Sequence, residues 1–109
     1  MSGKSIIKAI DILSELKMEV TKRHQLIGMK LINSVVLGYF KKGSDIDVII
    51  ALKEVNWIIE KDVYEICYYV GLKHEVVISP VVYSEDEIND KRTKVSSLFM
   101  AIERDGLNI

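Results

Sequence analysis

A chain of 109 residues is long enough for one domain with a modest hydrophobic core, and we expect a single domain over residues 1–109. Acidic and basic residues nearly balance at a formal net charge of −1, so any site for nucleic acid or another polyanion must be local. Cys67 is the single cysteine, which excludes an internal disulfide. No apolar run approaches the roughly 20 residues that span a bilayer. We therefore expect a cytoplasmic protein, with enough apolar surface for a homo-oligomer interface.

The N-terminal half predicts a helix followed by two strands. Apolar residues recur at three- and four-residue steps, and Gly28 is the expected end of this helix. The stripe consists of Ile6, Ile10, Leu13, Leu16 and Val20. The β-branched and apolar run 34–40 predicts a buried strand, and residues 45–52 predict a second one. The polar turn 41–44 between them is short, which predicts an antiparallel hairpin.

The C-terminal half predicts a helix, a strand and two further helices. The second helix runs from Val55 to Val70 with Gly71 as its cap, and the third strand spans residues 75–83. Residues 84–87 have a capping-box pattern, and a last helix closes at Gly106. The element order is α-β-β-α-β-α-α. Because a strand, a helix and a strand in succession form a crossover, we expect an α/β fold with a small mixed β-sheet flanked by helices.

The segment Asp45-Ile46-Asp47 is the strongest candidate for a functional site. In a strand both aspartates point to one face, with their backbones roughly 6.5–7 Å apart. Hard oxygen ligands of this kind suit Mg²⁺, which can assist an in-line phosphoryl displacement. The simpler interpretation is that both aspartates are solvated residues beside a Gly-Ser turn.

The order of several segments resembles the minimal nucleotidyltransferases of the DNA polymerase β superfamily. Members of that family have a strand that ends in Gly-Ser, a loop, and Ser-Asp-x-Asp at the start of the next strand. Residues 35–38 and 44–48 match these segments. Residues 78–87 are similar to the third strand and the following helix start, and residues 99–106 to the closing helix. The resemblance therefore covers nearly all of the chain.

The resemblance implies Mg²⁺-dependent transfer of a nucleoside monophosphate from a nucleoside triphosphate, with ATP as the first candidate. Asp45 and Asp47 would hold the metal. Glu75 would be the third ligand or the base, with Ser79 as the competing match for that position. Four residues would lie near the phosphates: Gly38, Lys42, Gly43 and Ser44.

The chain departs from the family pattern in the phosphate loop. Tyr39 follows Gly38 where the family has serine, and the segment from Gly38 to Asp45 is shorter than usual. Two hypotheses follow. The chain is an active enzyme in which Lys41 or Lys42 supplies the lost phosphate contacts. Alternatively, it has lost catalysis and serves as the antitoxin-type partner of a helical protein of the HEPN type.

Several other residues are not predicted to act in the site. His24 and His74 lack metal-ligand spacing, and Cys67 is expected in the core rather than as a nucleophile. The second predicted helix also carries four aromatic residues that either pack on the sheet or form a partner surface, and we expect at least some of them to pack. They are Trp57, Tyr64, Tyr68 and Tyr69.

Overall fold

The computed structural model describes residues 2–32 and 45–109, with side chains from residue 7 onward. The helices are α1 (Ser2–Arg23), α2 (Trp57–His74), α3 (Glu85–Asn89), α4 (Lys91–Lys94) and α5 (Ser97–Asp105). The strands are β1 (Leu26–Ile32), β2 (Asp45–Leu52), β3 (Val77–Ser84) and β4 (Leu107–Asn108). No helix in these ranges is both long and apolar enough to cross a membrane.

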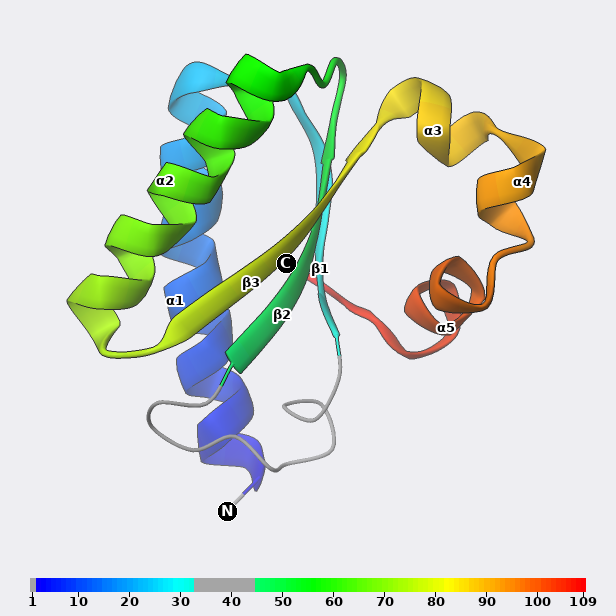
Figure 1. Cartoon of the computed structure of the whole chain (residues 1–109). Coiled ribbons are helices and arrows are strands. Elements are labelled where there is room, and N and C mark those ends of the chain that lie inside the picture. Colours follow the sequence, from blue (N-terminus) through cyan, green and yellow to red (C-terminus); the bar gives the residue numbers. More distant parts are fainter. Residues whose placement is uncertain (1, 33–44) are drawn as a thin grey trace.

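The strands form one mixed sheet in the order β3-β2-β1-β4. β1 is antiparallel to β2 and to β4, whereas β2 and β3 are parallel and are connected through α2. Helices α1 and α2 cover one face of the sheet, and α3, α4 and α5 lie on the other side (Figure 1). The predicted α/β class with a mixed sheet flanked by helices is confirmed.

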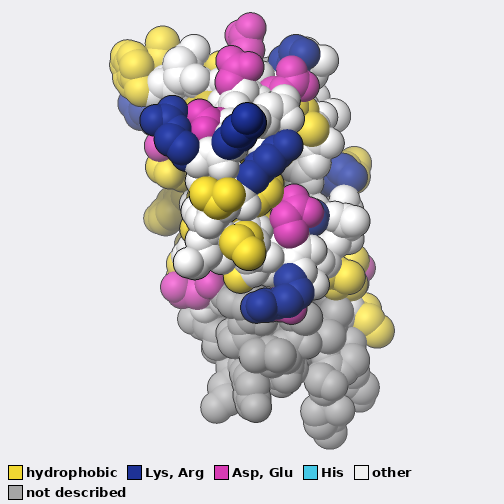
Figure 2. Space-filling model, turned by 90° about the vertical axis from the view of Figure 1, so that its right-hand side faces the viewer, with side chains coloured by type: hydrophobic (Ala, Val, Ile, Leu, Met, Phe, Trp, Pro, Cys, Tyr) yellow, Lys and Arg dark blue, Asp and Glu magenta, His cyan; other side chains and the backbone are white. Residues whose placement is uncertain are grey.

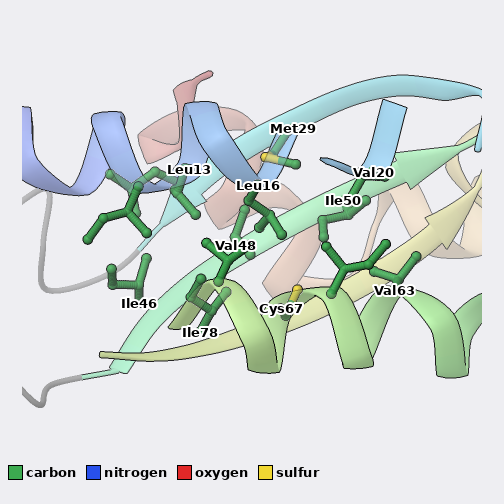
Figure 3. Close-up of a cluster of buried hydrophobic side chains, with 14 of the residues drawn as sticks. Leu13, Leu16, Val20, Met29, Ile46, Val48, Ile50, Val63, Cys67 and Ile78 are labelled. Atoms are coloured by element: carbon green, nitrogen blue, oxygen red, sulfur yellow. The ribbon is translucent and has the colours of Figure 1, made fainter. Parts of the chain in front are cut away.

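The hydrophobic core fills the space between the sheet and the pair α1 and α2. Leu13, Leu16 and Val20 of the predicted apolar stripe have no exposed surface. Figure 3 shows these side chains directed toward the strands, where residues such as Val48 and Ile50 of β2 meet them. Burial of this apolar surface is the main favourable term in folding, and it fixes β2 at the centre of the sheet.

The first strand lies earlier in the chain than predicted. α1 ends at Arg23, and β1 begins at Leu26, so Gly28 is a strand residue and not a helix stop. The reason is that burial repeats here every two residues, as in a strand, and no longer every three to four residues, as in α1. Met29 and Leu31 are buried, whereas their neighbours Gly28 and Lys30 are partly exposed. The predicted strand 34–40 and the turn 41–44 lie outside the described residues. The antiparallel partner of β2 is therefore β1.

The end of α2 also differs from the prediction. Gly71 lies inside the helix, and Glu75 is the C-cap residue, with a left-handed φ of 58°. A Cβ atom on Gly71 would lie 2.6 Å from the carbonyl oxygen of Val76, so glycine lets the chain leading into β3 pass close to the helix. The C-terminal part of the chain follows its prediction more closely. The capping box of Ser84 and Glu87 is formed, and Gly106 is the C-cap of α5.

The aromatic residues of α2 are largely exposed, although Tyr64 and Tyr68 line a hollow together with Val77 and Pro80 of β3. The exposed fraction is 75% for Trp57, 64% for Tyr68 and 67% for Tyr69, and Tyr64 is also exposed. The two alternatives therefore divide among them: Tyr64 and Tyr68 lie beside the edge strand β3, whereas Trp57 and Tyr69 line no part of that hollow. The inward face of α2 is instead formed by smaller side chains, among them Val63, Cys67 and Val70.

Two ion-pair clusters join α1 and α2. Asp62 of α2 contacts His24 at 2.7 Å and Arg23 at 2.9 Å. Glu15 of α1 contacts His74 at 3.1 Å, together with Lys73. Both histidines therefore serve helix packing, in agreement with the interpretation that they are not metal ligands.

The Asp62 cluster makes the free energy of unfolding depend on pH in the acidic range. The hydrogen bond from His24 and the charge of Arg23 lower the pKa of Asp62 below its ordinary value of 3.8. A lowered pKa in the folded state stabilises the protein above pH 4, and this contribution disappears as the pH falls through the lowered value. We expect Asp62→Asn to reduce the free energy of unfolding by about 1 kcal/mol at pH 7. The difference from wild type should narrow as the pH falls from 4 through the lowered pKa of Asp62.

Urea denaturation of both proteins at pH 7 and at pH 2.5 would measure this difference. Glu19→Gln is the matched control, because it removes a carboxylate from the exposed pair with Lys22. The control should change the free energy of unfolding by less than about 0.5 kcal/mol. An Asp62→Asn effect of equal size at both pH values would show that charge is not its cause.

Candidate active site

The carboxylate pair lies at the start of the central strand. Asp45 and Asp47 are the first and third residues of β2, and they alternate with the fully buried Ile46 and Val48. Successive side chains of a strand point to opposite faces, so both aspartates lie on the face turned away from α1 and α2. Asp45 is exposed and Asp47 is half-buried. Both side chains are therefore accessible to a ligand on this face.

The register of the sheet determines which residues flank the pair. On β3, Val77 is opposite Asp45 and Ser79 is opposite Asp47. On β1, Ile32 is opposite Asp47. Paired residues of neighbouring strands point to the same face, so the Ser79 hydroxyl is next to Asp47. Ser79, the competing match, therefore holds the position on β3 that corresponds to Asp47.

Glu75 does not lie on β3 as predicted. The strand begins at Val77, and the left-handed backbone at Glu75 ends α2 two residues earlier. The strand alternation that would place Glu75 on one face with Val77 and Ser79 therefore does not reach it. Its backbone N–H instead donates to the carbonyl of Leu72 at 3.3 Å. The position of Glu75 is that of a helix cap.

Substitution of Glu75 by glycine distinguishes a role in capping α2 from a role in catalysis. Left-handed backbone costs an L-residue roughly 1 kcal/mol relative to glycine. We expect Glu75→Gly to raise the free energy of unfolding by up to about 1 kcal/mol and to leave nucleotide binding within about twofold of wild type. Chemical denaturation and calorimetric titration of Mg-ATP measure the two effects. A large loss of binding in both Glu75→Gly and Glu75→Gln would assign Glu75 to the site.

The residues predicted near the phosphates lie outside the described part of the chain. These are Gly38, Lys42, Gly43 and Ser44. The prediction that the phosphate loop is shortened also falls on these residues, so it stays a prediction.

The donor set on this face suits one magnesium ion shared with a nucleotide. Among the residues that the structure describes, no three His, Cys, Asp or Glu side chains are grouped closely enough to hold a metal by themselves. Mg²⁺ does not need such a group, since it is commonly held by one or two carboxylates together with substrate phosphates and water. Asp45 and Asp47 provide two carboxylates of this kind on one face.

A lysine that sequence reasoning missed lies on the same face. Lys30 of β1 is opposite Ile49, the next residue on this face of β2 after Asp47. Its ammonium group is 3.6 Å from the carboxylate of Glu103 on α5. The signal in the sequence that could have placed Lys30 on the site face is its position between the apolar Met29 and Leu31, which a strand directs to the opposite face. Figure 2 shows the side of the molecule that carries α3, α4 and α5, where hydrophobic side chains lie among Lys and Arg side chains.

Cys67 is a core residue, as predicted. Its side chain is 1% exposed, and burial raises the pKa of the thiol to about 12. A thiol protonated at neutral pH is a poor nucleophile. Cys67 therefore contributes packing and not chemistry.

Two known proteins are similar to this chain, one in sequence and one in fold. A protein of Methanocaldococcus jannaschii described as a putative protein adenylyltransferase is 27% identical to this chain over 106 residues, which span 94% of this chain and 100% of the relative. The crystal structure of a putative nucleotidyltransferase from Sulfolobus solfataricus has the same fold. It matches with a TM-score of 0.52 and 20% identity, over 98% of this chain and 84% of the other. No protein-family model matches the chain. The two similar proteins confirm the resemblance predicted from the sequence.

Proposed function

We propose that this protein transfers a nucleoside monophosphate from a nucleoside triphosphate to an acceptor hydroxyl, with Asp45 and Asp47 as the catalytic pair. The observation that supports this function is the position of the pair, at the start of the central strand and on the sheet face opposite the α1–α2 layer. The hydrophobic core buries the intervening Ile46 and Val48 completely. Packing therefore holds the strand beneath the two carboxylates in one register, as precise positioning of a phosphate requires.

The chemistry is an in-line displacement at the α-phosphorus. The acceptor oxygen forms a bond to this phosphorus while the bond to the oxygen bridging to the β-phosphate breaks, and pyrophosphate leaves. The proton of the hydroxyl passes to a carboxylate of the pair. Asp45 and Asp47 would hold Mg²⁺, which would supply positive charge against the charge that develops on the phosphates. The Ser79 hydroxyl, in register with Asp47, is placed to hydrogen-bond the same ligands.

The similar M. jannaschii protein is described as a putative protein adenylyltransferase, and this description supports ATP as the donor and a protein as the acceptor. Such an acceptor would bring its own hydroxyl to the open sheet face. For the phosphate grip, we propose that Gly38, Gly43 and Ser44 lie near the phosphates, and that Lys41 or Lys42 acts as a point charge. The exposed aromatic side chains of α2, among them Trp57 and Tyr68, are suited to contact with a protein partner. A helical protein of the HEPN type remains our candidate for that partner.

The position of the transferred label tests the reaction class. The purified protein is incubated with Mg²⁺ and a bacterial or archaeal lysate in the presence of ATP labelled at either the α- or the γ-phosphate. Nucleotidyl transfer moves the α-label to the acceptor and releases the γ-label in pyrophosphate. We expect α-labelled ATP to give labelling in excess of the same lysate with the Asp47→Asn protein, γ-labelled ATP to give no such excess, and EDTA to abolish it. An excess from the γ-phosphate would identify phosphoryl transfer instead. Mg-ATP binding without any transfer would favour a nucleotide-regulated binding protein.

A further inference from the structure

A small cavity opens on the same sheet face as the carboxylate pair. It measures about 110 Å³ and lies between the sheet and α5. Two small residues, Gly28 of β1 and Ala51 of β2, are paired in the sheet and line the cavity. A Cβ atom added to Gly28 would meet no atom within 4 Å. The hollow therefore exists because these two paired positions lack larger side chains.

The walls of the cavity are apolar and its rim is charged. Tyr83 of β3 and Phe99 of α5 line one side in an edge-to-face contact, with ring centroids 6.0 Å apart. Ile102 of α5, 3% exposed, lines the wall as well. The only charged groups among the described lining residues are Lys30 and Glu103, which pair across 3.6 Å. A flat apolar group with a polar edge matches such a lining.

The cavity begins one step along β2 from the catalytic pair. Ile49 is the next residue after Asp47 on this face, roughly 7 Å away at the backbone, and it lines the cavity. Lys30 is opposite Ile49 and lines the cavity too. A molecule whose phosphates contact Asp47 can therefore reach the cavity with a group attached through one sugar.

We propose that this cavity receives the purine base of the donor triphosphate, an inference that rests on the proposed function. Pockets for whole drug-sized ligands measure roughly 300–1,000 Å³, so a cavity of about 110 Å³ suits a single ring system and not an entire nucleotide. The apolar walls cover the faces of the base. The carboxylate of Glu103 accepts a hydrogen bond from the exocyclic amino group of adenine. Lys30 lies on the side that leads to the phosphates.

Substitution of Gly28 by a larger residue fills the cavity, and it tests the proposal without removing any contact. Gly28→Val adds a branched side chain to a strand position with open space above it, and valine suits strands. Ile27→Phe is the matched control, because it adds bulk at the neighbouring residue of β1, which does not line the cavity. Calorimetry on each protein measures the dissociation constants of Mg-ATP and of Mg-tripolyphosphate, which has no base. Thermal unfolding verifies that each variant is folded.

We expect Gly28→Val to weaken Mg-ATP binding by about tenfold or more and to leave Mg-tripolyphosphate binding within about twofold of wild type. Ile27→Phe should change neither constant. If folded Gly28→Val binds Mg-ATP as tightly as the wild type, while Asp47→Asn still abolishes Mg-ATP binding, the base site is overturned. The proposed function is not affected by that outcome. Equal weakening of both ligands would also overturn it, since the effect would then lie at the phosphates. Absence of binding of both ligands to the wild type would overturn the proposed function together with the base site.

Discussion

Asp47→Asn is expected to lower the rate of nucleotidyl transfer by on the order of 10³-fold, equivalent to about 4 kcal/mol of transition-state stabilisation. The substitution preserves the size of the side chain and removes its negative charge, so the site loses one of two hard ligands for a divalent cation. The measurement is the initial rate of α-label transfer from ATP at saturating Mg²⁺. Calorimetry should show a parallel loss of Mg²⁺-dependent ATP binding.

Asp11→Asn is the matched control for this experiment. Asp11 is an exposed residue of α1, and its substitution removes the same charge away from the candidate site. The control should retain the wild-type rate within about twofold. If Asp47→Asn is folded and retains more than a tenth of the wild-type rate, the pair is not the catalytic centre. The same outcome for Asp45→Asn would reduce both aspartates to solvated residues at the start of β2.

Leu16→Ala is expected to reduce the free energy of unfolding by 2–5 kcal/mol. Leu16 has no exposed surface and points from α1 toward β2 near Val48 (Figure 3). Alanine is the better helix former, so the loss comes from missing contacts and the cavity that remains, not from helix propensity. For a domain of this size the total stability is roughly 5–15 kcal/mol, so this single change removes a large part of it. Equilibrium urea denaturation followed by circular dichroism measures the effect.

Met18→Ala is the control on the outer face of the same helix. Met18 is 64% exposed, so its truncation should change the free energy of unfolding by less than about 0.5 kcal/mol. A loss below 1 kcal/mol in Leu16→Ala would contradict the packing of α1 on the sheet. It would also weaken the argument that the core holds β2 in place beneath the carboxylates.

The candidate site was predictable in its central part and not at its margins. The alternation of apolar residues and aspartates in residues 45–52 is enough to place Asp45 and Asp47 on one face, because a strand repeats every two residues. The third-strand position could not be assigned in this way. Glu75 and Ser79 differ by four residues, so both fit the same face of an extended chain. Only the pairing of β2 with β3 selects Ser79 as the residue opposite Asp47.

The sequence by itself determined the features that depend on local periodicity and capping: the buried stripe of α1, the start of β2, the capping box at Ser84 and the end of α5 at Gly106. Such features depend on neighbouring residues along the chain, so they are visible in a short window. The tertiary structure decided which segment pairs with β2, where α2 ends, and that Gly28 and Ala51 meet to leave a cavity beside the carboxylate pair. These depend on contacts between residues far apart in the chain, where register and close backbone approach outweigh local propensity.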